Sequence, residues 1–129
     1  MLFRSGWRID HPQELSILNQ LETIAHAKVI AGHLGSAFHS LMYLGCDFAE
    51  KTVIALGMLD QEQDSSLANY VFQFRHQPIA LHYICCLRFT YRSIRHKAIQ
   101  SNRFRHLRFA FAPDMLARRV EEIASQATQ

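Results

Sequence analysis

Cysteine is scarce in this sequence, and its three cysteines stand where they suit neither cross-linking nor metal binding. Cys46 is isolated, whereas Cys85 and Cys86 are neighbours. An odd number without metal-type spacing argues against a secreted disulfide framework and against a zinc site. No stretch approaches the ~18 uninterrupted apolar residues of a bilayer-spanning helix, and the first ten residues do not resemble a signal peptide. We therefore expect a cytoplasmic protein with no membrane contact.

Motifs that identify many enzymes and sequence-specific nucleic-acid readers are also lacking. We find no glycine-rich phosphate loop, no Ser-His-Asp order and no paired catalytic carboxylates. No helix-turn-helix, zinc finger or RNP-type aromatic strand is recognisable, so base-specific readout is not expected. The sequence favours a protein without catalysis of its own and without a cofactor.

The apolar residues that are present recur mostly at helical spacing. The chain of 129 residues is long enough for one domain with its own core, and its 49% hydrophobic and 19% charged residues are typical of globular proteins. The clearest stripe has the spacing i, i+3, i+4, i+7 and consists of Leu67, Tyr70, Val71 and Phe74. We predict an all-α fold, a single compact bundle of about five or six helices over residues 1–129.

Local signals set the bounds of the predicted helices. Pro12 suits the first turn of an opening helix, and the glycines that follow this helix either kink it or make it restart at Ser36. Asp47 and Glu50 have the spacing of a capping box. The predicted helical ranges are 14–33, 36–44, 47–59, 66–74, 79–100 and 113 onward. A short β-hairpin between residues 2–9 and 104–111 is also compatible with the pattern.

Charge is distributed very unevenly along the chain. Residues 1–64 contain four Lys/Arg and eight Asp/Glu, whereas residues 65–113 contain eight Lys/Arg and no acid at all. The net charge of +3 hides this asymmetry. A long basic stretch without local acidic partners predicts an anionic partner.

The basic stretch leads to our first functional hypothesis. On the helix predicted over 79–100, Arg88, Arg92 and Arg95 form one row, and guanidiniums about one turn apart can each meet a phosphate. We predict a small non-catalytic subunit that contacts nucleic acid, preferably RNA or a single strand, within a larger nucleoprotein or multi-protein assembly. The small subunits of CRISPR effector complexes are similar in design, by analogy only. The residues predicted to contact the backbone are Arg88, Arg92, Arg95, Lys97, Arg103, Arg105 and Arg108, and those predicted to stack are Phe89 and Phe104.

Arg75 and His82 support a second hypothesis. The stretch FRHQPIALHY contains an arginine, six further residues, a histidine and an aromatic residue. In this it resembles the motif of the HEPN ribonucleases, which are all-α bundles of about this size. The resemblance covers ten residues and implies a metal-independent ribonuclease whose motif opens a helix. His82 would move a proton at the ribose 2′-OH or leaving oxygen, and Arg75 would hold the scissile phosphate.

Two further alternatives stay open. Glu22, His26 and His33 share one stripe of the first predicted helix, but a metal site in a bundle needs matching ligands from other helices, and none is recognisable. We therefore expect no metal. The arginines would also suit a protein–protein interaction, inhibitor or immunity module whose basic face meets an acidic partner, or they would simply pair with the acidic first half of the chain.

Overall fold

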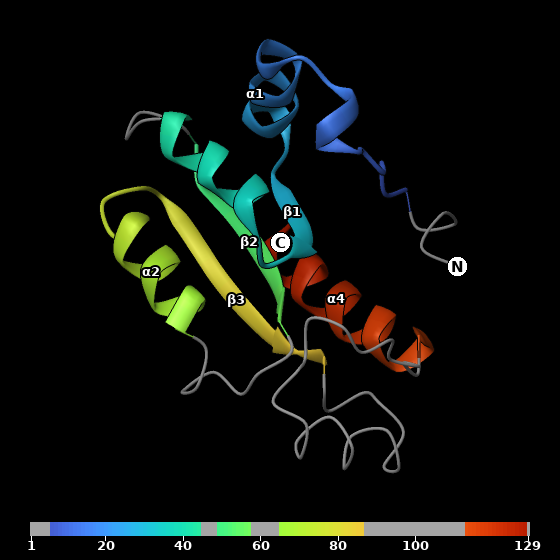
Figure 1. Ribbon diagram of the computed structural model, residues 1–129. Coiled ribbons are helices and arrows are strands. Elements are labelled where there is room, and N and C mark those ends of the chain that lie inside the picture. Colours follow the sequence, from blue (N-terminus) through green and yellow to red (C-terminus); the bar gives the residue numbers. More distant parts are fainter. Residues whose placement is uncertain (1–5, 45–48, 58–64, 87–112, 129) are drawn as a thin grey trace, which may run out of the picture.

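The computed structural model describes residues 6–44, 49–57, 65–86 and 113–128, and these form a mixed α/β fold around a parallel sheet (Figure 1). The sheet has the strand order β1-β2-β3, and each neighbouring pair is parallel. Its strands are β1 (Val29–His33), β2 (Lys51–Gly57) and β3 (Ile79–Cys85). This is a Rossmann-like α/β arrangement, so the predicted all-α helical bundle is wrong.

The central strand β2 is extended because its residues are β-branched and buried on both sides. Thr52, Val53 and Ile54 follow one another, and β-branched side chains favour extended backbone. Val53 and Ile54 are both 0% exposed although neighbouring side chains in a strand point to opposite faces. The helix predicted over 47–59 is therefore wrong, since a strand covered on both faces shows no polar alternation that would distinguish it from a buried helix.

The helix predicted over 79–100 is wrong at its beginning, where β3 pairs with β2. The register runs from Lys51 opposite Ile79 to Gly57 opposite Cys85. The Lys51 amide donates to the Pro78 carbonyl oxygen at 2.9 Å, which starts the pairing just ahead of β3. The remainder of that predicted helix lies outside the described residues.

The first predicted helix divides into a helix and a strand. After a short 3₁₀ turn, η2 (Pro12–Glu14), helix α1 (Ile17–His26) begins at Ser16, whose side chain accepts from the Asn19 amide at 3.2 Å. The helix ends at Ala27, which has extended backbone, and β1 follows. The prediction of one helix over 14–33 is wrong in its second part.

Three other predicted helices are confirmed. They are η3 (Ser36–Leu44), a 3₁₀ helix that starts anew after β1, α2 (Ser65–Gln73) and α4 (Pro113–Ala127). Within the stripe predicted for α2, Leu67, Tyr70 and Phe74 are buried, whereas Val71 is 55% exposed. The amphipathic pattern therefore identified the helix and most of its inner face.

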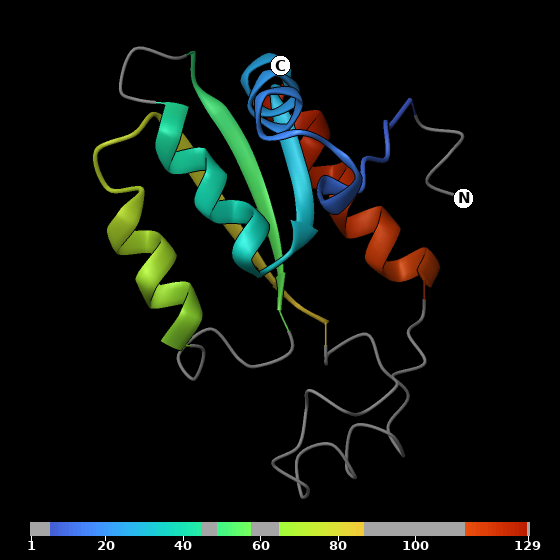
Figure 2. The same ribbon diagram turned by 45° about the horizontal axis from the view of Figure 1, so that its top comes forward.

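Helices cover both faces of the sheet (Figure 2). On one face η3 and α2 pack over the strands, and the buried cluster there consists of Phe38, Leu41, Leu44, Val53, Ala55, Tyr70 and Phe74. On the opposite face α4 places Val120 and Ile123 against Ile54 and Ile84. Helix α1 packs beside η3. The sheet is thus the middle of three layers.

The suggested β-hairpin and the expected absence of a membrane-spanning helix can be compared with the structure in part. Residues 6–9 of the suggested hairpin contain no strand, and its second arm, 104–111, lies outside the described residues. Within the described ranges, no helix is both long and apolar enough to cross a membrane.

Candidate ligand-binding cleft beside β1

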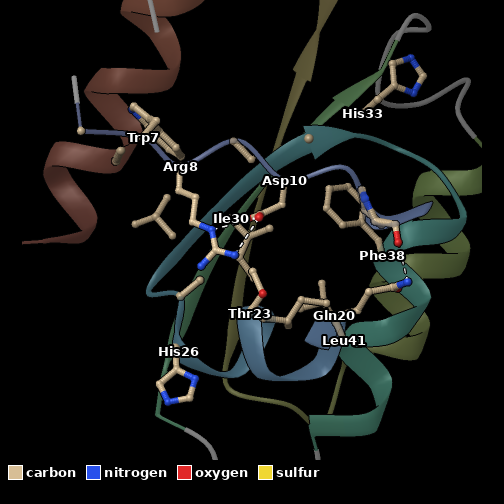
Figure 3. A pocket seen from close by; sticks show the side chains of 18 of the residues that line it. Trp7, Arg8, Asp10, Gln20, Thr23, His26, Ile30, His33, Phe38 and Leu41 are labelled. Atoms are coloured by element: carbon tan, nitrogen blue, oxygen red, sulfur yellow. Dashed lines mark hydrogen bonds and ion pairs between the residues drawn. The ribbon is translucent and has the colours of Figure 1, made fainter. Parts of the chain in front are cut away.

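A cleft with a volume of about 880 Å³ runs along the outer edge of β1 (Figure 3). All five residues of β1 line it, and in the part of the chain that the structure describes β1 pairs with β2 alone. The other walls come from the segment before α1, from α1 itself, from η3 and from the end of α4. Small-molecule sites in proteins typically have volumes of about 300–1,000 Å³, and this cleft falls in that range.

The backbone of β1 lines the cleft, and the residues of this strand alternate between those whose amide and carbonyl bond to β2 and those whose amide and carbonyl point the other way. The Thr52 amide donates to the Lys28 carbonyl at 2.9 Å, and the Leu34 amide donates to the Leu56 carbonyl at 2.8 Å. In a parallel pair, alternate residues direct both backbone groups at the same neighbour. The amides and carbonyls of Val29, Ala31 and His33 are therefore directed away from β2 and toward the cleft.

At the carboxyl end of β1 the chain turns into η3 through Leu34 and Gly35. The first amide to bond within η3 is that of Phe38, which donates to the Gly35 carbonyl at 3.0 Å. The amides of Gly35, Ser36 and Ala37 precede it and stand at the open end of the helix. The Tyr70 hydroxyl of α2 donates to the same Gly35 carbonyl at 2.6 Å. The turn is thus held from the side of α2.

A charged pair crosses the cleft on the side of the N-terminal segment. Figure 3 shows Arg8 reaching toward Asp10, and its Nη2 lies 2.9 Å from Asp10 Oδ1. The segment is fastened at both ends: Trp7 Nε1 donates to Glu121 Oε1 of α4 at 2.8 Å, and Gln20 Nε2 donates to the Pro12 carbonyl at 2.7 Å. The Arg8 side chain is 70% exposed, so its guanidinium is accessible to a ligand.

The remaining lining combines apolar and uncharged polar side chains. Trp7, Ile24 and Ile30 are half-buried, and Thr23 lies beside them on α1. His26 and His33 lie at opposite margins of the cleft in Figure 3. An arrangement of this kind suits a ligand with a planar or apolar part and an anionic part.

No metal site is formed by the residues that the structure describes, since no group of three or more His, Cys, Asp or Glu side chains lies together among them. The stripe of Glu22, His26 and His33 on a single helix does not exist, because His33 belongs to β1. His26 instead places Nδ1 2.8 Å from the Glu22 carbonyl oxygen within α1.

Arg75 and His82 do not open a helix. Arg75 follows α2, where its Nη1 donates to the Phe72 carbonyl at 2.7 Å and its guanidinium carbon lies 3.8 Å from the centre of the Phe72 ring. His82 is an exposed residue of β3, in register with Ile54. The resemblance to HEPN ribonucleases therefore does not extend to the fold. A catalytic role for the two residues stays a prediction.

The residues predicted to contact nucleic acid all fall between positions 88 and 108, outside the described residues, and their role stays a prediction. They are Arg88, Phe89, Arg92, Arg95, Lys97, Arg103, Phe104, Arg105 and Arg108. Of the cysteines, Cys85 and Cys86 are free and buried, whereas Cys46 also lies outside the described ranges.

The sequence analysis missed the cleft because it interpreted the glycines at 32 and 35 as interruptions of a helix. The signal that would have identified the strand and its turn is a short apolar run with two β-branched residues, Val29 and Ile30, followed by a glycine at 32 and another at 35. That β1 lies at an edge depends on strand order, which no local pattern reveals.

Comparison with known proteins adds no relative: no protein-family model, no curated protein and no solved structure matches this chain.

Proposed function

We propose that this protein binds a nucleotide, or a similar phosphorylated small molecule, in the cleft beside β1. The observation that carries the proposal is that the cleft reaches Gly32 and His33, the last residues of β1, and Phe38 of the helix η3 that follows. In open parallel α/β sheets, ligands bind outside the carboxyl ends of the strands. The phosphate would lie at this end, and the rest of the ligand would extend along β1.

The phosphate end has donors and free space. Amides at the start of a helix attract anions because they lack partners within the helix and carry the positive end of its dipole. A Cβ atom added at Gly35 would meet only the His33 carbonyl oxygen, at 3.8 Å, so the turn is not crowded there. Arg8 offers a second cationic group when it exchanges Asp10 for the ligand.

The rest of the cleft suits a base and a sugar. Trp7 and Ile30 offer apolar contact, and Thr23 offers a hydroxyl. The outward amide and carbonyl of Ala31 are available to the polar edge of a base. This division into an apolar wall and a polar floor is typical of small-molecule sites.

Isothermal titration calorimetry with UDP, ADP and the corresponding nucleosides tests the proposal. We expect the diphosphates to bind and the nucleosides to bind more weakly, because the phosphate contacts the amides and Arg8. Gly35→Asp and Gly35→Ala form a matched pair: both add a Cβ, but only aspartate adds a negative charge beside the amides. Gly35→Asp should weaken diphosphate binding about tenfold, and Gly35→Ala should leave it nearly unchanged. Equal effects of the two variants, or no binding of any nucleotide, would exclude the site.

Contact with nucleic acid is a second proposal, supported by the run from 65 to 113 that contains eight Lys/Arg and no acid. Binding of labelled single-stranded RNA should weaken steeply with salt, since each phosphate contact releases counterions. Reversal of Arg88, Arg92 and Arg95 to glutamate should abolish it, while UDP binding in the cleft stays. Salt-independent binding would exclude this role, and a stoichiometric acidic protein recovered with the chain would favour the interaction-module alternative. A cytoplasmic location suits all three roles and stays a prediction.

A further inference from the structure

Trp7 lies on the wall of the cleft that borders α4, and its side chain is held by two kinds of contact. Its Nε1 donates to Glu121 Oε1 at 2.8 Å, and the side chain also packs against the buried cluster that contains Ile54 and Val120. Trp7 and Glu121 both line the cleft, and both are half-buried. The indole is therefore a fixed part of the wall, although the segment 7–11 that carries it contains no helix or strand.

The way in which the indole is held leaves an aromatic surface for a ligand. A hydrogen bond from Nε1 lies in the plane of the ring, so the bond to Glu121 uses one edge of the indole and neither of its faces. The part of the side chain that the buried cluster does not cover borders the cleft. Such a surface stacks on flat, conjugated groups, and every nucleobase has one.

Charge indicates which part of the ligand lies at Trp7. The Glu121 carboxylate stands next to the indole and repels a phosphate, because both groups are negatively charged. Figure 3 shows Trp7 beside α4 and His33 on the other side of the view, so the carboxyl end of β1, where the phosphate is assigned, lies apart from this wall. An uncharged, planar group is therefore the part of a phosphorylated ligand that suits the wall at Trp7.

We propose that Trp7 stacks on the nucleobase of the ligand, and that Glu121 is the positioning residue that holds the indole for this contact. The inference rests on the proposed function and narrows it, because it selects nucleotides over sugar phosphates that lack a base. Stacking tolerates different bases, since each has a π-face. Trp7 thus determines the class of ligand and leaves the identity of the base to other contacts.

Titration of the natural full chain with UMP, AMP and ribose 5-phosphate, followed by calorimetry and fluorescence, tests the proposal. These probes carry the same phosphate and differ in the base, and Trp7 is the only tryptophan of the chain, so indole emission reports on this wall alone. UMP and AMP should bind about tenfold more tightly than ribose 5-phosphate, the lower part of the range for a base stacked on an aromatic side chain. They should also quench the emission. In Trp7→Leu the preference for UMP and AMP should disappear, while the dissociation constant of ribose 5-phosphate stays unchanged.

Glu121→Ala and Glu122→Ala form a matched pair on α4. Glu121 bonds the indole, whereas Glu122 is exposed and pairs with Arg119 at 3.1 Å. Loss of Glu121 should lower the preference for UMP over ribose 5-phosphate about threefold, because the indole is no longer fixed, and loss of Glu122 should leave the preference unchanged. This ratio decides the question if Trp7→Leu does not fold, since a merely structural role would weaken both ligands equally.

The possible failures are distinguishable. If neither UDP nor ADP binds the natural chain, the proposed function fails and this inference fails with it. If they bind, but UMP and AMP bind no more tightly than ribose 5-phosphate, this inference is overturned and the proposed function stands. The same holds if the preference persists in Trp7→Leu, or in Glu121→Ala where that variant must stand alone.

Discussion

Replacement of Gly57 by alanine should destabilise the protein because the ring of Tyr83 occupies the space that a side chain would need. Gly57 ends β2, and Tyr83 lies on the adjacent strand β3. A Cβ atom at position 57 would come 2.6 Å from Tyr83 Cζ, and the hydroxyl lies closer still. Carbon atoms pack best at about 3.5–4.0 Å, so the ring must move by about 1 Å. Tyr83 packs against the buried cluster on that face, so it cannot move freely.

The size of the destabilisation by Gly57→Ala follows from two opposing effects on the free energy of unfolding. Overpacking of a filled site costs about 1–3 kcal/mol, whereas exchange of glycine for alanine stabilises by about 0.4–1 kcal/mol through the unfolded chain. The net loss should be about 1–2 kcal/mol in the free energy of unfolding. Urea denaturation followed by circular dichroism measures this as a lower midpoint at unchanged slope.

Two comparisons separate this cause from a general intolerance of substitution. In a Tyr83→Ala background, Gly57→Ala should be neutral or stabilising, because the obstructing ring is gone. Gly32→Ala is the control in β1: its Cβ would meet Phe38 Cζ at 3.6 Å, an ordinary contact, so stability should hardly change. If Gly57→Ala costs the same with and without the Tyr83 ring, the steric explanation is refuted.

Three other predictions concern stability and are measured by the same denaturation assay. Lys51 is 4% exposed, and its Nζ donates to the Ala25 and Ala27 carbonyls, each at 2.7 Å. Lys51→Met should therefore lower the free energy of unfolding by about 2–3 kcal/mol. A neutral result would show that these bonds do not hold the end of α1. Ser16→Ala should cost about 1 kcal/mol by removing the cap of α1 and Ser16→Asp should not, whereas equal losses would argue against capping. Burial, with a smaller contribution from Cys85, raises the pKa of Cys86 from 9.0 to about 11. The neutral Cys86 thiol therefore contributes fully to the free energy of unfolding below pH 9, and this contribution is lost as the pH rises toward 11, by at most about 1.4 kcal/mol per pH unit. Cys86→Ala should lack this part of the decline in stability. An unchanged dependence of stability on pH in the variant would contradict the prediction.

The helices were predictable where one side of the element meets solvent. In α4, Val120 and Ile123 are buried, and charged side chains occupy much of the rest of that helix. The same holds for α2, whose inner stripe contains Tyr70. An amphipathic helix displays its period in the sequence, because burial on one side and exposure on the other select different residues.

The strands were not predictable from periodicity for the opposite reason. A strand of a parallel sheet between two helical layers is apolar on both sides, so its alternation disappears. In β1 the short run Val29–Ala31 follows α1 with no glycine or proline between them, and it therefore extended the apparent helix. Clusters of β-branched residues were the available signal, but β propensity depends strongly on context. The candidate site depends on which strand lies at the edge, and strand order arises only from tertiary packing.

The register of the sheet has a consequence for how the chain reaches this fold. Val29 pairs with Thr52 and Lys51 pairs with Ile79, so every ladder joins residues more than twenty positions apart. Neither ladder can begin as a hairpin; each demands closure of a long loop before its first bond forms. Both loops must bring a strand into contact with β2, so the sheet cannot form before β2 is in place. Topologies of this kind fold slowly. Until then β2, the most deeply buried strand among the described residues, has two unsatisfied edges, and newly made chains are most at risk of aggregation during that interval.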